Sequence, residues 1–168
     1  MFTIENKRRR GNMTYIIQTN HLTKDFQGKA VVSNVNLHVK KGEIYGFLGP
    51  NGAGKTTIMR MIMNLIKPTS GEVVIFDEKL TSSSYEILKR MGSIIEYPIF
   101  YDQLTAVENL ELHCEYLGYY NKNAIKSALD LVKLKEYEGK AVKDFSLGMK
   151  QRLGVARAIV TKPEILIL

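Results

Sequence analysis

The sequence contains only one cysteine among its 168 residues, and this scarcity excludes two kinds of stabilised fold. The single thiol, Cys114, can form no internal disulfide bond and cannot build a cysteine-based zinc site. No apolar run approaches the roughly 18–20 residues of a membrane-spanning helix. No apolar segment of the kind found in signal peptides follows the basic N-terminus. We therefore expect a single globular domain with a real core, working in a reducing cytosol.

Of the net charge of +7, residues 1–12 contribute +3 and the rest of the chain contributes +4. Residues 1–12 contain the basic side chains of Lys7 and Arg8–Arg10 against one acidic residue, Glu5. A basic cluster can indicate binding to nucleic acid or to an anionic membrane. However, Met13 begins a normal strand sequence, and two adjacent arginines are what the purine run of a bacterial ribosome-binding site encodes. We therefore interpret residues 1–12 as a non-native leader, expect no nucleic-acid partner, and regard mass spectrometry of the native N-terminus as the test.

The segment Gly49–Thr56 matches the pattern G-x-x-x-x-G-K-[ST] at every fixed position. An apolar run, Ile44–Leu48, precedes it and predicts a buried strand, and a helix-forming segment at residues 57–66 follows. Strand, glycine-rich loop and helix together are typical of a phosphate-binding loop. In such a loop backbone N–H groups and the start of the helix attract a polyphosphate. The pattern assigns Lys55 to the β- and γ-phosphates and the hydroxyl of Thr56 to Mg²⁺.

Apolar periodicity and turn residues predict strands that alternate with helices. We expect strands at residues 15–19, 29–39, 44–48, 72–76, 93–96 and 165–168, and helices at residues 57–66, 82–91, 105–117, 123–134 and 147–161. Thr105 and Glu108 have the spacing of a capping box. This alternation predicts an α/β fold with a largely parallel core, and the consecutive helices from about 105 to 145 predict a helical insertion.

A second motif, Ser146-Leu147-Gly148, opens the last of these helices, about a hundred residues after the phosphate loop. A serine at a helix N-cap with a glycine just inside is a second place where an anion can bind. Taken in isolation, an ordinary helix cap is the more common explanation of such a motif.

The two motifs together, from Met13 to Leu168, resemble the nucleotide-binding domain of ABC transporters. The resemblance implies an α/β P-loop NTPase fold of ABC type: a core parallel sheet, N-terminal antiparallel strands and a helical subdomain at about 97–145. It implies ATP and Mg²⁺ as ligands. The phosphates and metal are assigned to the Walker A loop, and Ser146 and Gly148 to the γ-phosphate of ATP held by the opposite monomer. The implied nucleotide-binding residues are Phe26, which would stack on adenine, and Asn51, Gly52, Gly54, Lys55, Thr56 and Thr57.

Three departures from the family pattern resemble the bacitracin and lantibiotic self-protection exporters of Gram-positive bacteria. Leu147 and Met149 replace the usual glycine and glutamine of the signature. Glu96 stands where the family has the glutamine of its Q-loop. A carboxylate is a stronger ligand for a hard cation than an amide, so we expect Glu96 to contact Mg²⁺ or the attacking water as a catalytic residue. The alternative is an exposed glutamate at the end of a strand.

The last residues, Ile165–Leu168, resemble the apolar Walker B strand. In the family an aspartate, a catalytic glutamate and a switch histidine follow, and none of them is in this sequence; His21, His38 and His113 all lie upstream. We therefore interpret the chain as a truncated ABC ATPase, and leave open whether it is an enzyme by itself.

The sequence thus predicts an ATP-binding subunit of a bacterial exporter for bacitracin- or lantibiotic-type peptides. The resemblance implies a head-to-tail dimer, a separate membrane-spanning permease, and a location at the inner face of the membrane. The alternatives are a non-catalytic fragment or pseudogene product, and a soluble ABC ATPase of translation or DNA repair. The DNA after codon 168 would discriminate between an enzyme and a fragment.

Overall fold

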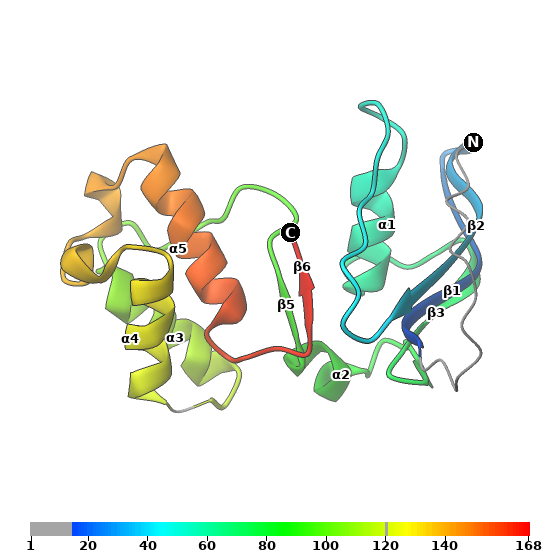
Figure 1. Cartoon of the computed structure of the whole chain (residues 1–168). Helices are drawn as coiled ribbons and strands as arrows, with labels where there is room; N and C mark the ends of the chain where they lie inside the picture. Colours follow the sequence, from blue (N-terminus) through cyan, green and yellow to red (C-terminus); the bar gives the residue numbers. More distant parts are fainter. Residues whose placement is uncertain (1–14, 120) are drawn as a thin grey trace. The chain divides into compact units, whose positions relative to one another are not determined.

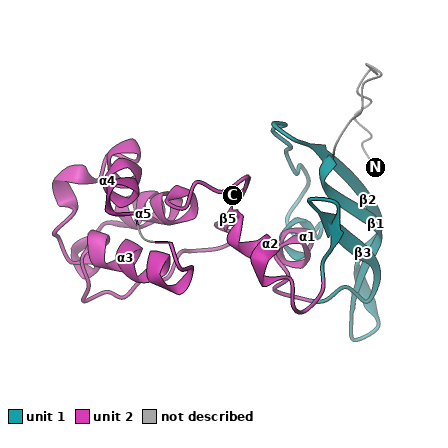
Figure 2. Cartoon of the chain, turned by 90° about the horizontal axis from the view of Figure 1, so that it is seen from below, with its two compact units in different colours: residues 1–57, 67–80 teal, residues 58–66, 81–168 magenta. Residues whose placement is uncertain are grey.

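The structure, a computed structural model, describes residues 15–119 and 121–168 and divides into two compact units (Figures 1 and 2). Unit 1 contains the described residues up to Thr57 together with Lys67–Leu80, and unit 2 contains Ile58–Ile66 and Thr81–Leu168. The proposed leader at residues 1–12, and the start at Met13, lie outside the described residues.

Unit 1 is built on an antiparallel sheet, the teal strands of Figure 2. Its strands are β1 (Tyr15–Phe26), β2 (Lys29–Lys40), β3 (Ser70–Ile75) and β4 (Glu78–Lys79), in the order β2-β1-β3-β4. Apolar side chains such as Leu22 and Ile75 are fully buried on it. Thr19 is also fully buried; its hydroxyl donates to the carbonyl of Val35 at 2.9 Å and accepts from the N–H of Leu37 at 2.9 Å. The hydroxyl group of Thr19 is therefore hydrogen-bonded in the core, and it links β1 to β2.

Two residues, Gln27 and Gly28, connect β1 to β2. Both have positive φ values, 53° and 81°, which is the signature of a type I′ hairpin turn. The carboxylate of Asp25 accepts a hydrogen bond from the N–H of Gly28 at 2.7 Å. The turn brings Phe26 opposite Lys29 and leaves Phe26 at the very end of β1.

The helix after the phosphate loop, α1 (Lys55–Ile62), ends earlier than its apolar sequence predicts. Asn64 takes the left-handed conformation with φ of 57°, a common helix stop for asparagine. The N–H of Leu65 then reaches back to the carbonyl of Arg60 at 2.8 Å. The side chain of Asn64 donates to the carbonyl of Thr81 at 2.8 Å. The prediction of a helix to residue 66 was therefore wrong by one turn.

The segment Ile44–Leu48, predicted as a buried strand, is neither buried nor a strand. Ile44 is 100% exposed and Leu48 is 91% exposed. A strand is held in place by hydrogen bonds to a neighbouring strand. In the described part of the chain, neither sheet includes a strand paired with residues 44–48. An apolar run alone therefore did not decide the conformation here.

Unit 2 contains a short parallel pair and a group of helices, shown in magenta in Figure 2. The pair is β5 (Met91–Ser93) beside β6 (Ile165–Ile167), and α2 (Tyr85–Lys89) precedes it. The helices are α3 (Ala106–Tyr116), α4 (Lys122–Leu131) and α5 (Leu147–Ile159), with short 3-10 turns at Lys135–Tyr137 and Val142–Asp144. Their shared core contains Leu110, Leu129, Leu134, Val142 and Leu153, all fully buried.

The helix starts agree with the capping residues in the sequence. The predicted capping box of α3 is present: Thr105 Oγ1 accepts from the N–H of Glu108, and the Glu108 carboxylate accepts from the N–H of Thr105 at 2.7 Å. That hydrogen bond lowers the pKa of Glu108. Asn121 caps α4 in a similar way, and α4 ends three residues before the predicted position.

The predicted fold class is confirmed as mixed α/β with antiparallel N-terminal strands and a helical part. Among the described residues, parallel pairing is limited to β5 and β6. The strand predicted at residues 93–96 lies two residues earlier, at Met91–Ser93.

Gly92→Ala is expected to destabilise unit 2. A Cβ at this buried position of β5 would overlap the carbonyl oxygen of Ala158 and lie 3.0 Å from Cγ of Pro163. Overpacking against backbone typically costs about 1–3 kcal/mol of unfolding free energy. Urea denaturation measures it. Gly139→Ala is the matched control, because a Cβ there meets nothing within 4 Å. Equal denaturation midpoints for the two variants would contradict the packing described here.

Candidate functional site

The phosphate-loop residues form one continuous loop in unit 1, and its shape requires glycine at two positions. Gly52 and Gly54 have φ values of 83° and 84°, a conformation that other residues rarely adopt. A Cβ on Gly54 would lie only 2.7 Å from the carbonyl oxygen of Val31 and 3.1 Å from Cγ2 of Val32, both in β2. Gly52 has open space around it, so only its conformation requires glycine. The loop therefore packs directly against the second strand.

Lys55 directs its ammonium group back into this loop. Nζ donates to the carbonyl oxygens of Gly49 and Pro50 at 2.7 and 2.8 Å. Both acceptors are neutral, so these contacts orient the cation without cancelling its charge. A cation held this way is suited to an anionic ligand.

The helix α1 begins at Lys55, and its first turn contains no acidic residue. The N–H groups of a first helical turn have no partner inside the helix and carry the positive end of the helix dipole. The hydroxyl groups of Thr56 and Thr57 lie in the same turn, and Thr56 is exposed. Donors, a cation and hydroxyl groups are therefore all present at the place predicted for a polyphosphate.

Phe26, the residue predicted to stack on adenine, also belongs to unit 1. It is 46% exposed, which leaves the ring available to a flat ligand. The ammonium of Lys24 lies 5.0 Å from the centre of the ring and donates to the carbonyl of Lys67 at 2.7 Å. The cation therefore orients the ring through a cation–π contact.

Glu96 lies in a bend after β5 in unit 2, and its carboxylate forms an ion pair with Arg60 of α1. Arg60 was not predicted as a site residue from the sequence. The two residues are 36 positions apart, so no local pattern links them. The sequence did contain one indication of this pair: an acidic residue at the Q-loop position and a basic residue in the helix after the phosphate loop.

Ser146 and Gly148 stand at the start of α5 in unit 2. Ser146 is the N-cap, and its Oγ accepts a hydrogen bond from the N–H of Met149 at 3.2 Å. Ser146, Leu147 and Gly148 are all exposed. The cap expected from the sequence is therefore present, and this end of the 13-residue helix faces solvent.

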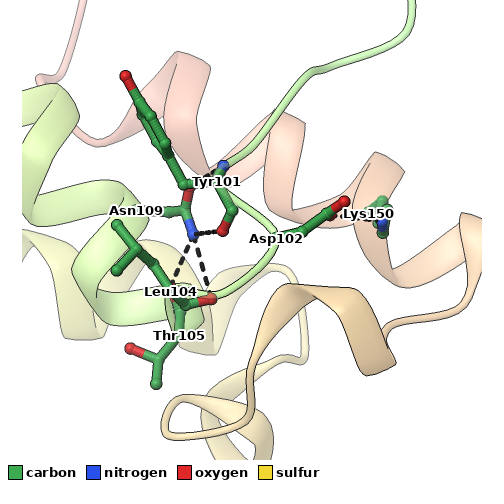
Figure 3. Close-up of polar contacts among 6 residues, drawn as sticks. All are labelled: Tyr101, Asp102, Leu104, Thr105, Asn109 and Lys150. Carbon is green, nitrogen blue, oxygen red and sulfur yellow. Dashed lines mark hydrogen bonds and ion pairs between the residues drawn. The ribbon is translucent and has the colours of Figure 1, made fainter.

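A buried asparagine organises the loop that leads into α3 (Figure 3). Asn109 is 5% exposed, and its amide oxygen accepts from the N–H of Tyr101 at 2.9 Å. Its amide nitrogen donates to the carbonyls of Tyr101 and Thr105 at 3.1 and 2.9 Å. In the same loop Asp102 pairs with Lys150, of the signature helix α5, at 2.9 Å. Side chains from α3 and α5 therefore both hold this loop in place.

Two further contacts from α5 reach the segment that follows Glu96. Arg157 donates to the carbonyl of Ile99 at 2.8 Å and lies 4.8 Å from the centre of the Phe100 ring. One turn earlier, a Cβ on Gly154 would come within 2.8 Å of Pro98 Cγ, so the helix and the proline are in close contact. Residues 98–100 are thus fixed to α5 by both packing and hydrogen bonding.

The surroundings of His113 in α3 lower its pKa. Burial lowers the pKa of His113, and the charge of Arg157 lowers it further. Its neutral form is therefore favoured in the folded protein.

A protein-family model described as "ABC transporter" matches residues 32–168. The chain belongs to the ABC transporter family. The match begins inside β2 and includes the phosphate loop, Glu96 and the start of α5. The predicted resemblance to this family is therefore confirmed.

Several curated proteins are similar over most of the chain. The ABC transporter ATP-binding protein YcbN of Bacillus subtilis is 69% identical over 156 residues, which are 93% of this chain and 51% of that protein. The bacitracin transport ATP-binding protein BcrA of Bacillus licheniformis is 53% identical, with the same coverage. The lantibiotic transport ATP-binding protein SrtF of Streptococcus pyogenes is 37% identical over 91% of this chain and 65% of that protein. The chain thus spans about half the length of the two Bacillus relatives.

Solved ABC ATPase structures share the fold. The ATP-binding subunit of an ABC transporter aligns with a TM-score of 0.82 at 26% identity, covering 90% of this chain and 65% of that one. A dimeric ATP-binding cassette, solved in a post-hydrolysis state with ADP and phosphate, aligns with a TM-score of 0.79 at 29% identity, covering 90% and 72%. Within residues 15–119 and 121–168, no helix is both long enough and apolar enough to span a bilayer.

Asn109→Leu is expected to lower the unfolding free energy by about 1–3 kcal/mol. Leucine has a similar size but leaves the N–H and carbonyl of Tyr101 without their side-chain partner, and an unsatisfied polar group costs that amount. Urea denaturation measures the change. The control is Asn123→Leu, at an exposed position of α4, where we expect a change within about 0.5 kcal/mol. If both variants match the parent, Asn109 does not hold this loop.

Proposed function

We propose that this chain binds MgATP as part of the ATP-binding subunit of a bacterial ABC exporter for bacitracin- or lantibiotic-type peptide antibiotics. One observation carries the nucleotide part of the proposal. The phosphate loop packs on β2 at Gly54, where no side chain fits, and places the cation of Lys55 beside the first turn of α1. A loop of this shape and charge is suited to a polyphosphate.

The residues present fit both the nucleotide and its metal. Phe26 offers an exposed, oriented ring for adenine, and Asn51–Thr57 supply backbone donors, the cation and the hydroxyl groups. Among the described residues, no group of three or more His, Cys, Asp and Glu side chains is placed to hold a metal ion. Mg²⁺ usually keeps waters and binds through few protein ligands plus substrate phosphates. The proposed protein ligands are the hydroxyl of Thr56 and the carboxylate of Glu96.

When bound, Mg²⁺ would supply charge neutralisation of the phosphates. This chain's own groups would do the rest. Lys55 would neutralise the β- and γ-phosphates, and Glu96 would orient the attacking water or a metal ligand. ATP hydrolysis is proposed for the whole protein, since this chain spans about half the length of the two Bacillus relatives.

Ser146 and Gly148 are proposed to contact the γ-phosphate of ATP bound to a second copy, in a head-to-tail dimer. Their exposure at the N-terminus of α5 supports this, because the helix dipole there favours an anion. The other proposed partner is a separate membrane-spanning permease, which would place the protein at the inner face of the membrane. BcrA and SrtF are named transport ATP-binding proteins, which supports a role in a transporter.

The antibiotic substrate class rests on two features of this sequence and on the names of its relatives. The signature variant at Ser146–Arg152 and the glutamate at position 96 resemble the self-protection exporters. BcrA and SrtF, which are 53% and 37% identical to this chain, carry bacitracin and lantibiotic transport in their names.

Lys55→Ala is expected to weaken ATP binding roughly 10–100-fold, because a charge-assisted hydrogen bond contributes about 1.5–3 kcal/mol. Equilibrium titration with fluorescently labelled ATP measures the affinity. Lys41→Ala is the matched control, since it removes the same charge from an exposed turn of unit 1. If the two alanine variants bind ATP equally well, the loop is not the nucleotide site.

The substrate class is tested in the bacterium that carries the gene. Lys55→Ala in the chromosomal copy is expected to lower the bacitracin concentration that stops growth, because transport would lose its energy source. Lys41→Ala is expected to leave that concentration unchanged. Altered sensitivity to a lantibiotic alone would reassign the substrate within the proposed class. Unchanged sensitivity to both would contradict export of these peptides.

A further inference from the structure

The ion pair between Arg60 and Glu96 joins helix α1 to the bend that follows β5. Arg60 lies in α1, the helix that begins at Lys55, and Glu96 lies in the bend after β5. Both residues belong to unit 2, so the contact is internal to one unit. The glutamine that the family has at this position is neutral, whereas the negative charge of Glu96 is paired with the positive charge of Arg60.

The backbone that follows Glu96 is held in place by its contacts. The segment immediately after it is fixed to α5, through the contact of Pro98 with Gly154 and the hydrogen bond from Arg157 to the carbonyl of Ile99. The backbone is therefore anchored on one side, and the carboxylate is drawn to α1 on the other. In the structure the carboxylate of Glu96 contacts Arg60.

The ion pair with Arg60 also affects how a cation can bind to the carboxylate of Glu96. The side chains of Arg60 and Glu96 are 41% and 60% exposed, so the pair is hydrated and contributes little to stability. A weak pair of this kind can open when a stronger ligand arrives. A divalent cation that approaches the carboxylate meets the positive charge of Arg60 at close range.

We propose that Arg60 is a positioning residue for Glu96: it orients the carboxylate and competes with Mg²⁺ for it. This inference rests on the proposed function, because it assumes that Glu96 takes part in binding the metal of MgATP. Arg60 would then set the Mg²⁺ concentration at which the metal strengthens nucleotide binding. Neither Arg60 nor this competition follows from the phosphate-loop and signature motifs.

The test measures the affinity of the 168-residue chain for labelled ATP across a series of free Mg²⁺ concentrations. The variants are Arg60→Gln, Arg60→Lys, Glu96→Gln and the double variant. Arg60→Gln is expected to lower the Mg²⁺ concentration that gives half of the metal-dependent gain by about two- to fivefold, the range of a surface ion pair. Arg60→Lys keeps the charge and is expected to stay near the parent. Glu96→Gln is expected to raise the Mg²⁺ concentration that gives half of the gain. In a chain that already carries Glu96→Gln, adding Arg60→Gln is expected to have no further effect.

Arg90→Gln is the matched control, because Arg90 and Glu164 form another exposed Arg–Glu pair in the same unit, at 2.7 Å. It is expected to leave the Mg²⁺ dependence unchanged. The inference is overturned if Arg60→Gln behaves like Arg90→Gln, or if its effect persists in the Glu96→Gln background. Failure of the proposed function looks different: the parent chain would bind no ATP, or would bind it as well after Lys55→Ala, and both proposals would then fall together.

Discussion

The close approach of Gly54 to β2 is the constraint on which the phosphate loop depends. The backbone of the loop lies so near the carbonyl of Val31 that any side chain at position 54 would collide with it. A positive φ at the same residue means that conformation and space demand glycine independently. With the loop fixed there, Lys55 can start α1 and still turn its ammonium back to Gly49 and Pro50. The antiparallel sheet of unit 1 is thus the support of the loop.

In unit 2 the helix α5 supports the signature residues and the neighbouring loops. Its N-terminus carries the exposed Ser146 and Gly148. Its cations reach two other segments of the unit: Lys150 and Arg157 reach residues 99–102, and Arg152 reaches the turn after α4. Arg152 donates to the carbonyl of Lys133 just after α4, at 3.0 Å. Because one helix both presents the signature residues and holds the surrounding loops, substitutions on its packed side would also affect the segment after Glu96.

Features specified by neighbouring residues could be predicted from the sequence. The capping box at Thr105, the helix start at Ser146 and the glycine loop before Lys55 are all short-range patterns, and the structure contains each of them. Features that depend on distant partners could not. The strand expected at residues 44–48 lacks a described neighbour, and the Arg60–Glu96 pair joins positions 36 residues apart. The chemical roles proposed for the site residues follow from the motifs.

The exposed segment Ile44–Leu48 has a consequence for the behaviour of the purified chain. It is five residues long, uncharged, free of proline and rich in β-forming side chains, and Ile44 and Leu48 are almost fully in contact with water. Short segments of this composition are the usual starting points of intermolecular β-pairing. Self-association through residues 44–48 would therefore limit solubility at high concentration, and a charged residue placed there would act as a gatekeeper against aggregation.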